Sequence, residues 1–371
     1  MQPVSVKPPS GFFRGRGVGT NEPSRFAAWA REPVDPGQGG PWEDEPDERG
    51  GSPASDPAAT VVHPTRAVRI VSRNDSPDIP FNQSINPYQG CEHGCVYCYA
   101  RPTHAWLGLS PGLDFERQVY AKTNAAELLR RELSQPGYVP EPIAIGANTD
   151  PYQPAERTQR VTRSVIEVLA EAKLPFTVTT KSALVVRDLD LLAPLAAQGL
   201  VRVFVSLPTL DPALARILEP RAPTPARRLR AMAELARAGV HVGVFVSPVI
   251  PALNDRHLEQ VLTAAKEAGA QSASSILLRL PLEVRDLFVQ WLQQHFPERA
   301  GHVMSLVRQM REGQDYTGRF GERMRGSGVH AQLLAQRFEL AARRLALARR
   351  LPPMSVAQFR APSAPGQMAL F

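Results

Sequence analysis

The chain has 371 residues, of which 43% are hydrophobic and 21% are charged, and its formal net charge is +7. No apolar run approaches the roughly 20 residues of a transmembrane helix, and the N-terminus lacks the pattern of a signal peptide. The composition therefore argues against a membrane protein and predicts a cytoplasmic protein with a sizeable core.

The positive charge is unevenly distributed. Residues 1–60 hold 6 Lys and Arg against 9 Asp and Glu, whereas the remainder holds 37 against 27. Arginine makes up 38 of the 43 basic residues, which suits bidentate recognition of phosphate or carboxylate groups. Two interpretations stay open: a basic face that binds nucleic acid, and a composition that reflects coding bias alone.

Residues 1–60 are dominated by Pro, Gly, Ser and charged residues. Such a segment buries too little apolar surface to offset the entropy of ordering it, so we predict a mostly disordered tail. Two short islands, Phe12–Gly17 and Arg25–Trp29, combine aromatic residues with arginine and could instead dock on the folded body.

The folded body is predicted to span residues 61–298, beginning with a strand at Ala67–Val71. Short apolar segments then alternate with helical patterns, which predicts six βα units. The expected parallel strands are Ser84–Asn86, Ile143–Gly146, Phe176–Thr179, Val201–Val205, His241–Val246 and Ser275–Leu278. We expect an α/β fold, a partial (β/α)6 barrel with a doubly wound sheet as the alternative, and functional residues at the C-terminal strand ends.

Residues 299–371 are predicted to form a basic, helical C-terminal extension. Residues 299–350 contain 11 Arg against 4 Asp and Glu, and the apolar spacing predicts a helix from Gln332 to Ala348. This helix could pack on the barrel with its arginines in solvent, or it could form an arm that contacts phosphate groups.

All three cysteines lie in one short loop after the first parallel strand, at Cys91, Cys95 and Cys98. Thiolates bind zinc or iron–sulfur clusters, and both centres normally take four protein ligands. Three thiols therefore indicate a metal centre with one open coordination position, where a substrate or cosubstrate binds. There are two alternatives. One is a zinc site in which His93 is the fourth ligand, and the other is a set of three core cysteines that bind no metal.

The motif Cys-x-x-x-Cys-x-Tyr-Cys at the head of a βα series resembles the cluster loop of the radical S-adenosylmethionine superfamily. The neighbouring segments Asn86–Cys91, Tyr97–Arg101 and Thr149–Glu156 resemble the branch related to spore photoproduct lyase, over about residues 64–300. The resemblance implies a [4Fe–4S] cluster on the three cysteines, with S-adenosylmethionine on the fourth iron. It also implies reductive formation of a 5′-deoxyadenosyl radical that abstracts hydrogen from a substrate.

The resemblance extends to the residues that would contact S-adenosylmethionine. It implies cofactor contacts for Tyr97, Asn148, Thr149, Asp150, Lys181, Ser206, Val249 and Arg279. Among these, Tyr97 and Val249 would lie near the adenine, Asp150 near the methionyl amino group, and Lys181 near the carboxylate. From the residues alone, Asp150 could also cap a turn and Lys181 could be a solvated loop charge.

The chain also departs from this branch. It has no fourth cysteine to return a hydrogen atom to the product radical, so the lyase reaction itself is not expected. A tyrosine such as Tyr99 or Tyr152, or regenerated S-adenosylmethionine, would take that role. The resemblance implies an electron donor such as a flavodoxin or ferredoxin, and nucleic acid is a candidate substrate. The alternative is an iron–sulfur electron-transfer protein without cleavage chemistry.

Overall fold

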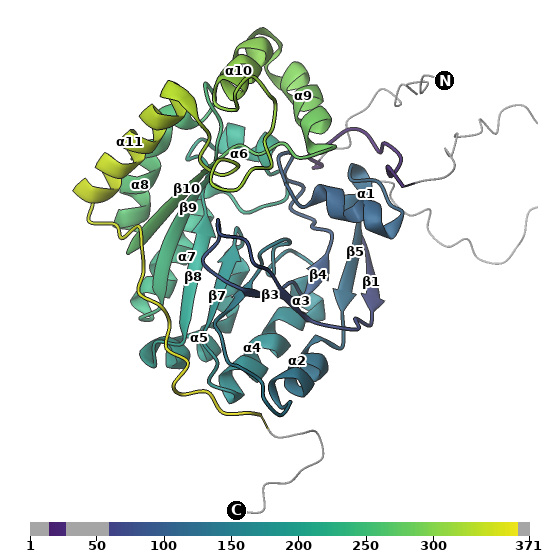
Figure 1. Ribbon diagram of the computed structural model, residues 1–371, viewed down its shortest axis with the longest axis vertical. Coiled ribbons are helices and arrows are strands. Elements are labelled where there is room, and N and C mark those ends of the chain that lie inside the picture. The colour runs from purple at the N-terminus through teal and green to yellow at the C-terminus, as the bar shows by residue number, and fades with distance from the viewer. Residues whose placement is uncertain (1–14, 27–58, 363–371) are drawn as a thin grey trace, which may run out of the picture.

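A computed structural model describes residues 15–26 and 59–362 of the chain (Figure 1). Its main sheet has the strand order β10-β9-β8-β7-β6-β3-β2, and every neighbouring pair is parallel except β2 and β3. The strands are β2 Val71–Arg73, β3 Gln83–Ile85, β6 Ile143–Ile145, β7 Phe176–Thr180, β8 Val201–Ser206, β9 His241–Val249 and β10 Ser272–Leu277. The predicted α/β fold with six parallel strands in a partial barrel is confirmed.

Helices connect the successive parallel strands and cover one face of the sheet (Figure 1). They are α2 Ala125–Leu133, α3 Glu156–Gln159, α4 Val161–Glu171, η2 Ala183–Asp188, α5 Leu189–Ala197, α6 Pro212–Leu218, α7 Pro225–Arg237, η3 Asp255–His257 and α8 Leu258–Glu267. The core lies between the sheet and these helices: Val203 and Val205 of β8 are buried, as are Met232 and Leu235 of α7. Each such side chain contributes roughly 1.5–3 kcal/mol through burial.

A second, three-stranded sheet flanks the barrel. It has the order β1-β5-β4, with β1 at Val61–Thr65, β5 at Gln118–Lys122 and β4 at Tyr88–Gln89. The strand predicted at Ala67–Val71 is wrong, because most of that segment links β1 to β2. Its apolar residues do not alternate toward one face: Val68 is 89% exposed, whereas the neighbouring Ile70 and Val71 are both buried.

Helices outside the barrel repeat cover its edge beside β10. They are α9 Val284–His295, α10 Pro297–Gln309 and α11 Gly328–Arg344, and the loop side carries η1 Arg101–Leu107 and α1 Leu113–Arg117. Helix α11 lies along α8 (Figure 1), where Arg337 pairs with Glu259 at 2.8 Å. This contact supports the packed-helix interpretation. In the described ranges no helix combines the length and apolarity needed to cross a membrane.

Residues 15–26 form a segment that packs on the cysteine loop. The side chain of Val18 is 2% exposed and contacts an apolar cluster that includes Cys95 and Tyr97. Backbone N–H of Gly17 donates to Glu116 Oε2 at 3.0 Å, and Arg16 Nη1 donates to the Glu116 carbonyl at 2.9 Å. These contacts favour docking for residues 15–17 of the first island and 25–26 of the second. The rest of the predicted tail lies outside the described residues.

The variant Gly17→Ala tests this docking. A Cβ at position 17 would lie 1.7 Å from the carbonyl oxygen of Gly94, so the segment would have to move off the loop. We expect faster amide hydrogen exchange in residues 15–26 and in the cysteine loop. Gly301→Ala is the matched control, because a Cβ there meets nothing within 4 Å. Equal exchange in wild type and Gly17→Ala would contradict the contact.

Candidate metal centre and cofactor site

The cysteine loop follows β3 and β4 and has no regular secondary structure beyond two turns. Backbone N–H of Gly94 donates to the Cys91 carbonyl at 3.3 Å, and that of Cys98 donates to the Cys95 carbonyl at 3.2 Å. Gly94 has a φ of +64°, and a Cβ there would meet Glu116 Oε2 at 2.7 Å. Both the backbone conformation and the close approach therefore require glycine at this position.

The loop is held from one side by a buried ion pair. Arg101 and Glu116 are both 0% exposed, and their side chains pair at 2.5 Å. The Arg101 Nε also donates to the Cys95 carbonyl at 3.0 Å, and Nη1 donates to the Gly112 carbonyl at 2.9 Å. Each buried polar group thus has a partner, and the loop backbone is fixed beside the second cysteine.

The three thiols lie on one loop, Cys91–Cys98. Cys91 and Cys95 are buried and Cys98 is partly exposed. Burial raises the pKa of Cys91 well above its usual value and that of Cys95 to about 12. Buried thiols of this kind become thiolates only when a bound cation compensates their charge. One side of the site, at Cys98, stays open.

The position of His93 argues against the zinc alternative. Among residues 15–26 and 59–362 no group of three or more His, Cys, Asp or Glu, the three cysteines included, is already arranged to hold a metal ion, so that finding does not distinguish zinc from a cluster. His93 does not complete the thiol set; its Nδ1 lies 3.3 Å from Asp150 Oδ2 instead.

Asp150 lies in the segment after β6, and Lys181 directly follows β7. The Asp150 carboxylate faces His93 and accepts hydrogen bonds from Thr180 Oγ1 at 2.6 Å and from the Lys181 backbone N–H at 2.7 Å. Burial alone would raise its pKa, but His93 and these donors lower it to about 2. Burial opposes a charged Lys181, yet the nearby Cys95 and Glu219 raise its pKa. Both groups are therefore charged at neutral pH.

Tyr97 is fixed by a buried network that begins outside the loop. Its hydroxyl donates to Glu219, which forms an ion pair with Arg228, and Lys181 Nζ lies 4.0 Å from the same carboxylate. Arg228 Nη1 also donates to the Ser206 carbonyl at 2.9 Å. Glu219 and Arg228 are 0–1% exposed in their side chains. The network links the loop to the ends of β7 and β8.

Arg279 lies just beyond β10, and its side chain contacts Tyr99, the residue after Cys98. Its guanidinium carbon is 4.9 Å from the ring centroid of Tyr99, whose hydroxyl donates to the Ala147 carbonyl. The Arg279 Nε is buried and has no hydrogen-bond partner among the described residues. The Nη2 of the same guanidinium donates to the Tyr316 hydroxyl at 3.5 Å, so the free donor is the Nε, which fits an acidic group of a bound cofactor.

The remaining predicted residues occupy different surroundings. Thr149 Oγ1 donates to the Tyr88 carbonyl at 2.8 Å, and Asn148 is exposed. Ser206 Oγ donates to the Ser247 carbonyl at 3.3 Å, and Val249 is buried at the end of β9. Tyr152 is fully buried and its hydroxyl donates to Asp188 Oδ2 at 3.0 Å.

Several residues that position the loop are absent from the sequence predictions. Gln153 donates to the Gly90 carbonyl at 3.1 Å and accepts from the Glu92 N–H at 2.9 Å. The end of α6 and the segment after it also hold the loop: Val96 N–H donates to the carbonyl of Leu218, the last residue of α6, at 3.1 Å, and Arg221 Nη2 lies 3.3 Å from Glu92 Oε1. The sequence carries no signal for these contacts, because it does not show that the residues after α6 lie against the loop.

Comparisons with known proteins agree with this arrangement. The family model described as the Radical SAM superfamily matches residues 85–265. An uncharacterized protein of Mycobacterium tuberculosis is 42% identical over 232 residues, which is 62% of this chain and 68% of the relative. An uncharacterized protein of Methanocaldococcus jannaschii is 27% identical over 214 residues, 58% of this chain and 76% of the relative.

Solved structures show the same fold. A spore photoproduct lyase mutant superposes with a TM-score of 0.54 and 19% identity, covering 77% of this chain and 79% of the other. A second mutant of that enzyme, with bound AdoMet and dinucleoside spore photoproduct, also has a TM-score of 0.54, with 18% identity and the same coverage. At these identities the likeness supports the fold alone.

The variant Glu219→Gln tests the network at Tyr97. It leaves the Arg228 charge buried without a counter-charge, so we expect the free energy of unfolding to fall by about 3–5 kcal/mol. Urea denaturation followed by circular dichroism measures it. Glu127→Gln is the matched control: it breaks the exposed Glu127–Arg131 pair and should cost less than about 1 kcal/mol. Similar small losses in both variants would contradict the network.

Proposed function

The chain belongs to the radical S-adenosylmethionine superfamily, and from this premise we propose that it reductively cleaves S-adenosylmethionine to a 5′-deoxyadenosyl radical. Membership implies a [4Fe–4S] cluster and S-adenosylmethionine as cofactors. When bound, they supply an electron to the sulfonium C–S bond and a radical that abstracts hydrogen from a substrate. The substrate is not established.

One observation carries the proposal: three thiols lie on one loop, Cys98 is partly exposed, and the nearby strand ends carry Lys181 and Arg279, whose buried Nε has no hydrogen-bond partner among the described residues. Cys91, Cys95 and Cys98 would hold the cluster and leave one iron without a protein ligand. In the proposal, Lys181 and Arg279 orient the methionyl carboxylate by charge.

The other predicted residues would bind S-adenosylmethionine or position the cysteine loop. Tyr97 would lie near the adenine, with Asn148, Thr149, Ser206 and Val249 as further contacts. Protein donors already face both oxygens of Asp150, which supports a role in orienting the loop through His93. In the proposal its negative charge also attracts the methionyl amino group.

For the return of a hydrogen atom to the product radical, the surroundings favour Tyr99 over Tyr152. Both hydroxyls donate a hydrogen bond, but Tyr99 lies next to Cys98 and is 42% exposed, whereas Tyr152 is fully buried. The proposal includes a cytoplasmic electron donor such as a flavodoxin or ferredoxin. Spore photoproduct lyase activity is not part of it, because the chain has no cysteine beyond its three ligands.

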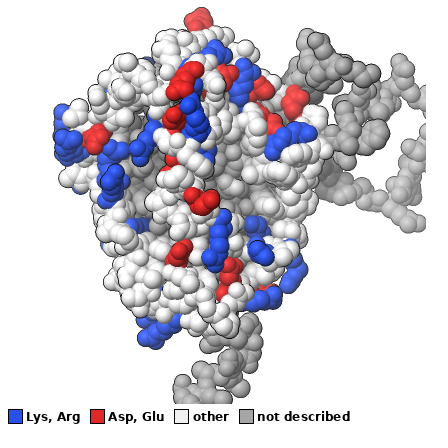
Figure 2. All heavy atoms as spheres, in the orientation of Figure 1, with Lys and Arg blue, Asp and Glu red and all other residues white. Residues whose placement is uncertain are grey.

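Nucleic acid is the substrate class we propose. Lys and Arg side chains gather along the edge of the molecule that α11 forms (Figures 1 and 2). The exposed arginines at this end are Arg343, Arg344, Arg349 and Arg350. By analogy, the spore photoproduct lyase structure with a bound dinucleoside spore photoproduct also points to nucleic acid as the substrate class.

Product analysis tests the cleavage reaction. We expect the anaerobic, reconstituted and chemically reduced protein to convert S-adenosylmethionine to 5′-deoxyadenosine and methionine, measured by liquid chromatography. Cys98→Ala should reduce the yield to that of the unreduced protein, because the cluster loses a ligand. If wild-type protein holds a reducible cluster but forms no 5′-deoxyadenosine, the electron-transfer alternative is favoured.

Oligonucleotide binding as a function of salt tests the substrate class. Replacing Arg343, Arg344, Arg349 and Arg350 with Gln should weaken binding of single-stranded DNA. The slope of log K against log salt should flatten by about 0.7 for each phosphate that the protein no longer neutralises. The control replaces two exposed arginines on another face, Arg66 and Arg131. Absence of binding at low salt, or an unchanged slope, would contradict nucleic-acid contact by this extension.

A further inference from the structure

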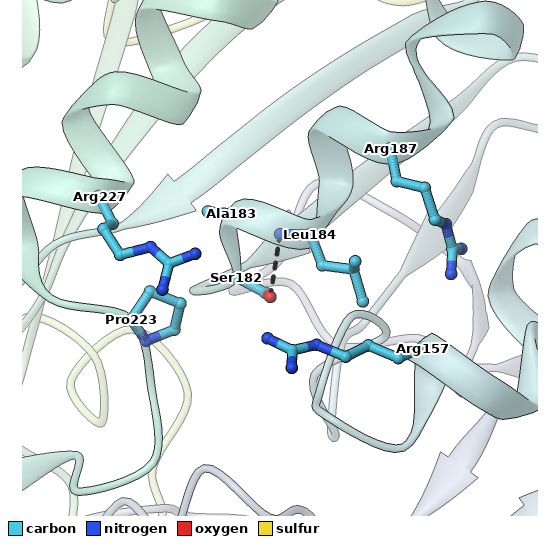
Figure 3. A pocket seen from close by; sticks show the side chains of 7 residues that line it. All are labelled: Arg157, Ser182, Ala183, Leu184, Arg187, Pro223 and Arg227. Atoms are coloured by element: carbon cyan, nitrogen blue, oxygen red, sulfur yellow. Dashed lines mark hydrogen bonds between the residues drawn. The ribbon is translucent and has the colours of Figure 1, made fainter.

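A hollow of about 190 Å³ lies beside the end of β7 (Figure 3). Three elements form its wall: Arg157 of α3, Ser182 with the following helix η2, and Arg227 of α7 with Pro223 just before that helix. In the described part of the chain its lining contains three arginines and no Asp or Glu. No predicted site residue lines it, although Ser182 directly follows Lys181.

Only one of the three arginines is neutralised. Arg187 pairs with Glu156 at 2.9 Å and with Asp188 at 2.8 Å, so its charge is compensated within the fold. Arg157 and Arg227 are exposed, and no carboxylate among residues 15–26 and 59–362 lies within 4.0 Å of either guanidinium. Two positive charges of the hollow therefore have no counter-charge in the described structure.

These two arginines converge on one space. Figure 3 shows the guanidinium groups of Arg157 and Arg227 extending from opposite sides toward Ser182. Like charges that face one hollow repel each other, and an anion between them removes that repulsion. A guanidinium presents paired N–H donors whose spacing matches the oxygens of phosphate and carboxylate groups.

Ser182 supplies a third donor. Its side chain is 7% exposed, and its Oγ accepts from the Leu184 N–H at 3.2 Å. Its backbone N–H donates to Thr180 Oγ1 at 2.9 Å, which fixes the residue at the end of β7. The hydroxyl hydrogen has no acceptor among the described residues and is free for a ligand oxygen.

We propose that this hollow binds a phosphate group, with Arg157 and Arg227 as its cationic ligands and Ser182 as its hydroxyl donor. Two guanidinium groups and a hydroxyl offer donors in three directions, which suits a tetrahedral oxyanion better than a planar carboxylate. The phosphate belongs either to a nucleic-acid backbone or to a small phosphorylated molecule. This site does not depend on the radical reaction, and it lies next to the candidate cofactor site because Ser182 follows Lys181 in the chain.

Equilibrium binding with three probes tests the site: inorganic phosphate, adenosine 5′-monophosphate and a single-stranded DNA 12-mer, each titrated into the full-length, cluster-reconstituted protein. We expect the double variant Arg157→Gln/Arg227→Gln to bind at least one probe about tenfold or more weakly than wild type. The control Arg131→Gln/Arg237→Gln removes the same charge. Its Arg237 lies ten residues beyond Arg227 along α7, about 15 Å away.

The pattern of losses identifies the source of the phosphate. Weaker binding of the 12-mer alone assigns the site to a nucleic-acid backbone, and weaker binding of the two small probes assigns it to a phosphorylated metabolite. If no probe binds wild type, or if the control weakens binding as much as the double variant, the proposal is wrong. Formation of 5′-deoxyadenosine should be retained in the double variant, which separates this test from that of the radical reaction.

Discussion

The candidate site depends on holding an irregular loop that carries three thiols in one conformation. No ladder of backbone hydrogen bonds does this, so buried charges do it instead: Arg101 paired with Glu116 on one side, and Glu219 paired with Arg228 on the other. Removing two such charges from water is costly, and the pairs persist only because their remaining hydrogen-bonding groups are also satisfied. The two buried ion pairs therefore fix the loop, and each pair depends on the hydrogen bonds that satisfy its remaining polar groups.

The same pairs balance charge around the thiols. Lys181, Arg228 and Arg279 bring positive charge to the strand ends, where Asp150 and Glu219 and, once a metal is bound, the thiolates are negative. A reduced cluster would add further negative charge, and the Arg279 guanidinium, whose Nε has no partner among the described residues, lies over the ring of Tyr99, the residue after Cys98. Electron transfer into a buried site is easier where fixed positive charge already compensates the added negative charge.

The fold could be predicted from sequence where the signal is local. The βα alternation predicts the six parallel strands that the structure contains, because that signal lies in neighbouring residues. The cysteine spacing is equally local, and it predicts the loop that we propose as the metal site. Glu219 could not be assigned, since its partners Tyr97 and Arg228 come from separate elements and an isolated Glu after a helix is ordinarily solvated. The second sheet was missed for a related reason: β1 and β5 pair across more than fifty residues.

The contact of residues 15–26 with the cysteine loop has a consequence for where the functional unit begins. The superfamily match starts at residue 85, yet Val18 fills part of the apolar cluster that supports Cys95 and Tyr97. A shortened protein that began at the family boundary would keep every proposed ligand and lose one wall of their surroundings. Relatives should therefore be compared for an N-terminal segment able to cover this loop, and not for the cysteine motif alone.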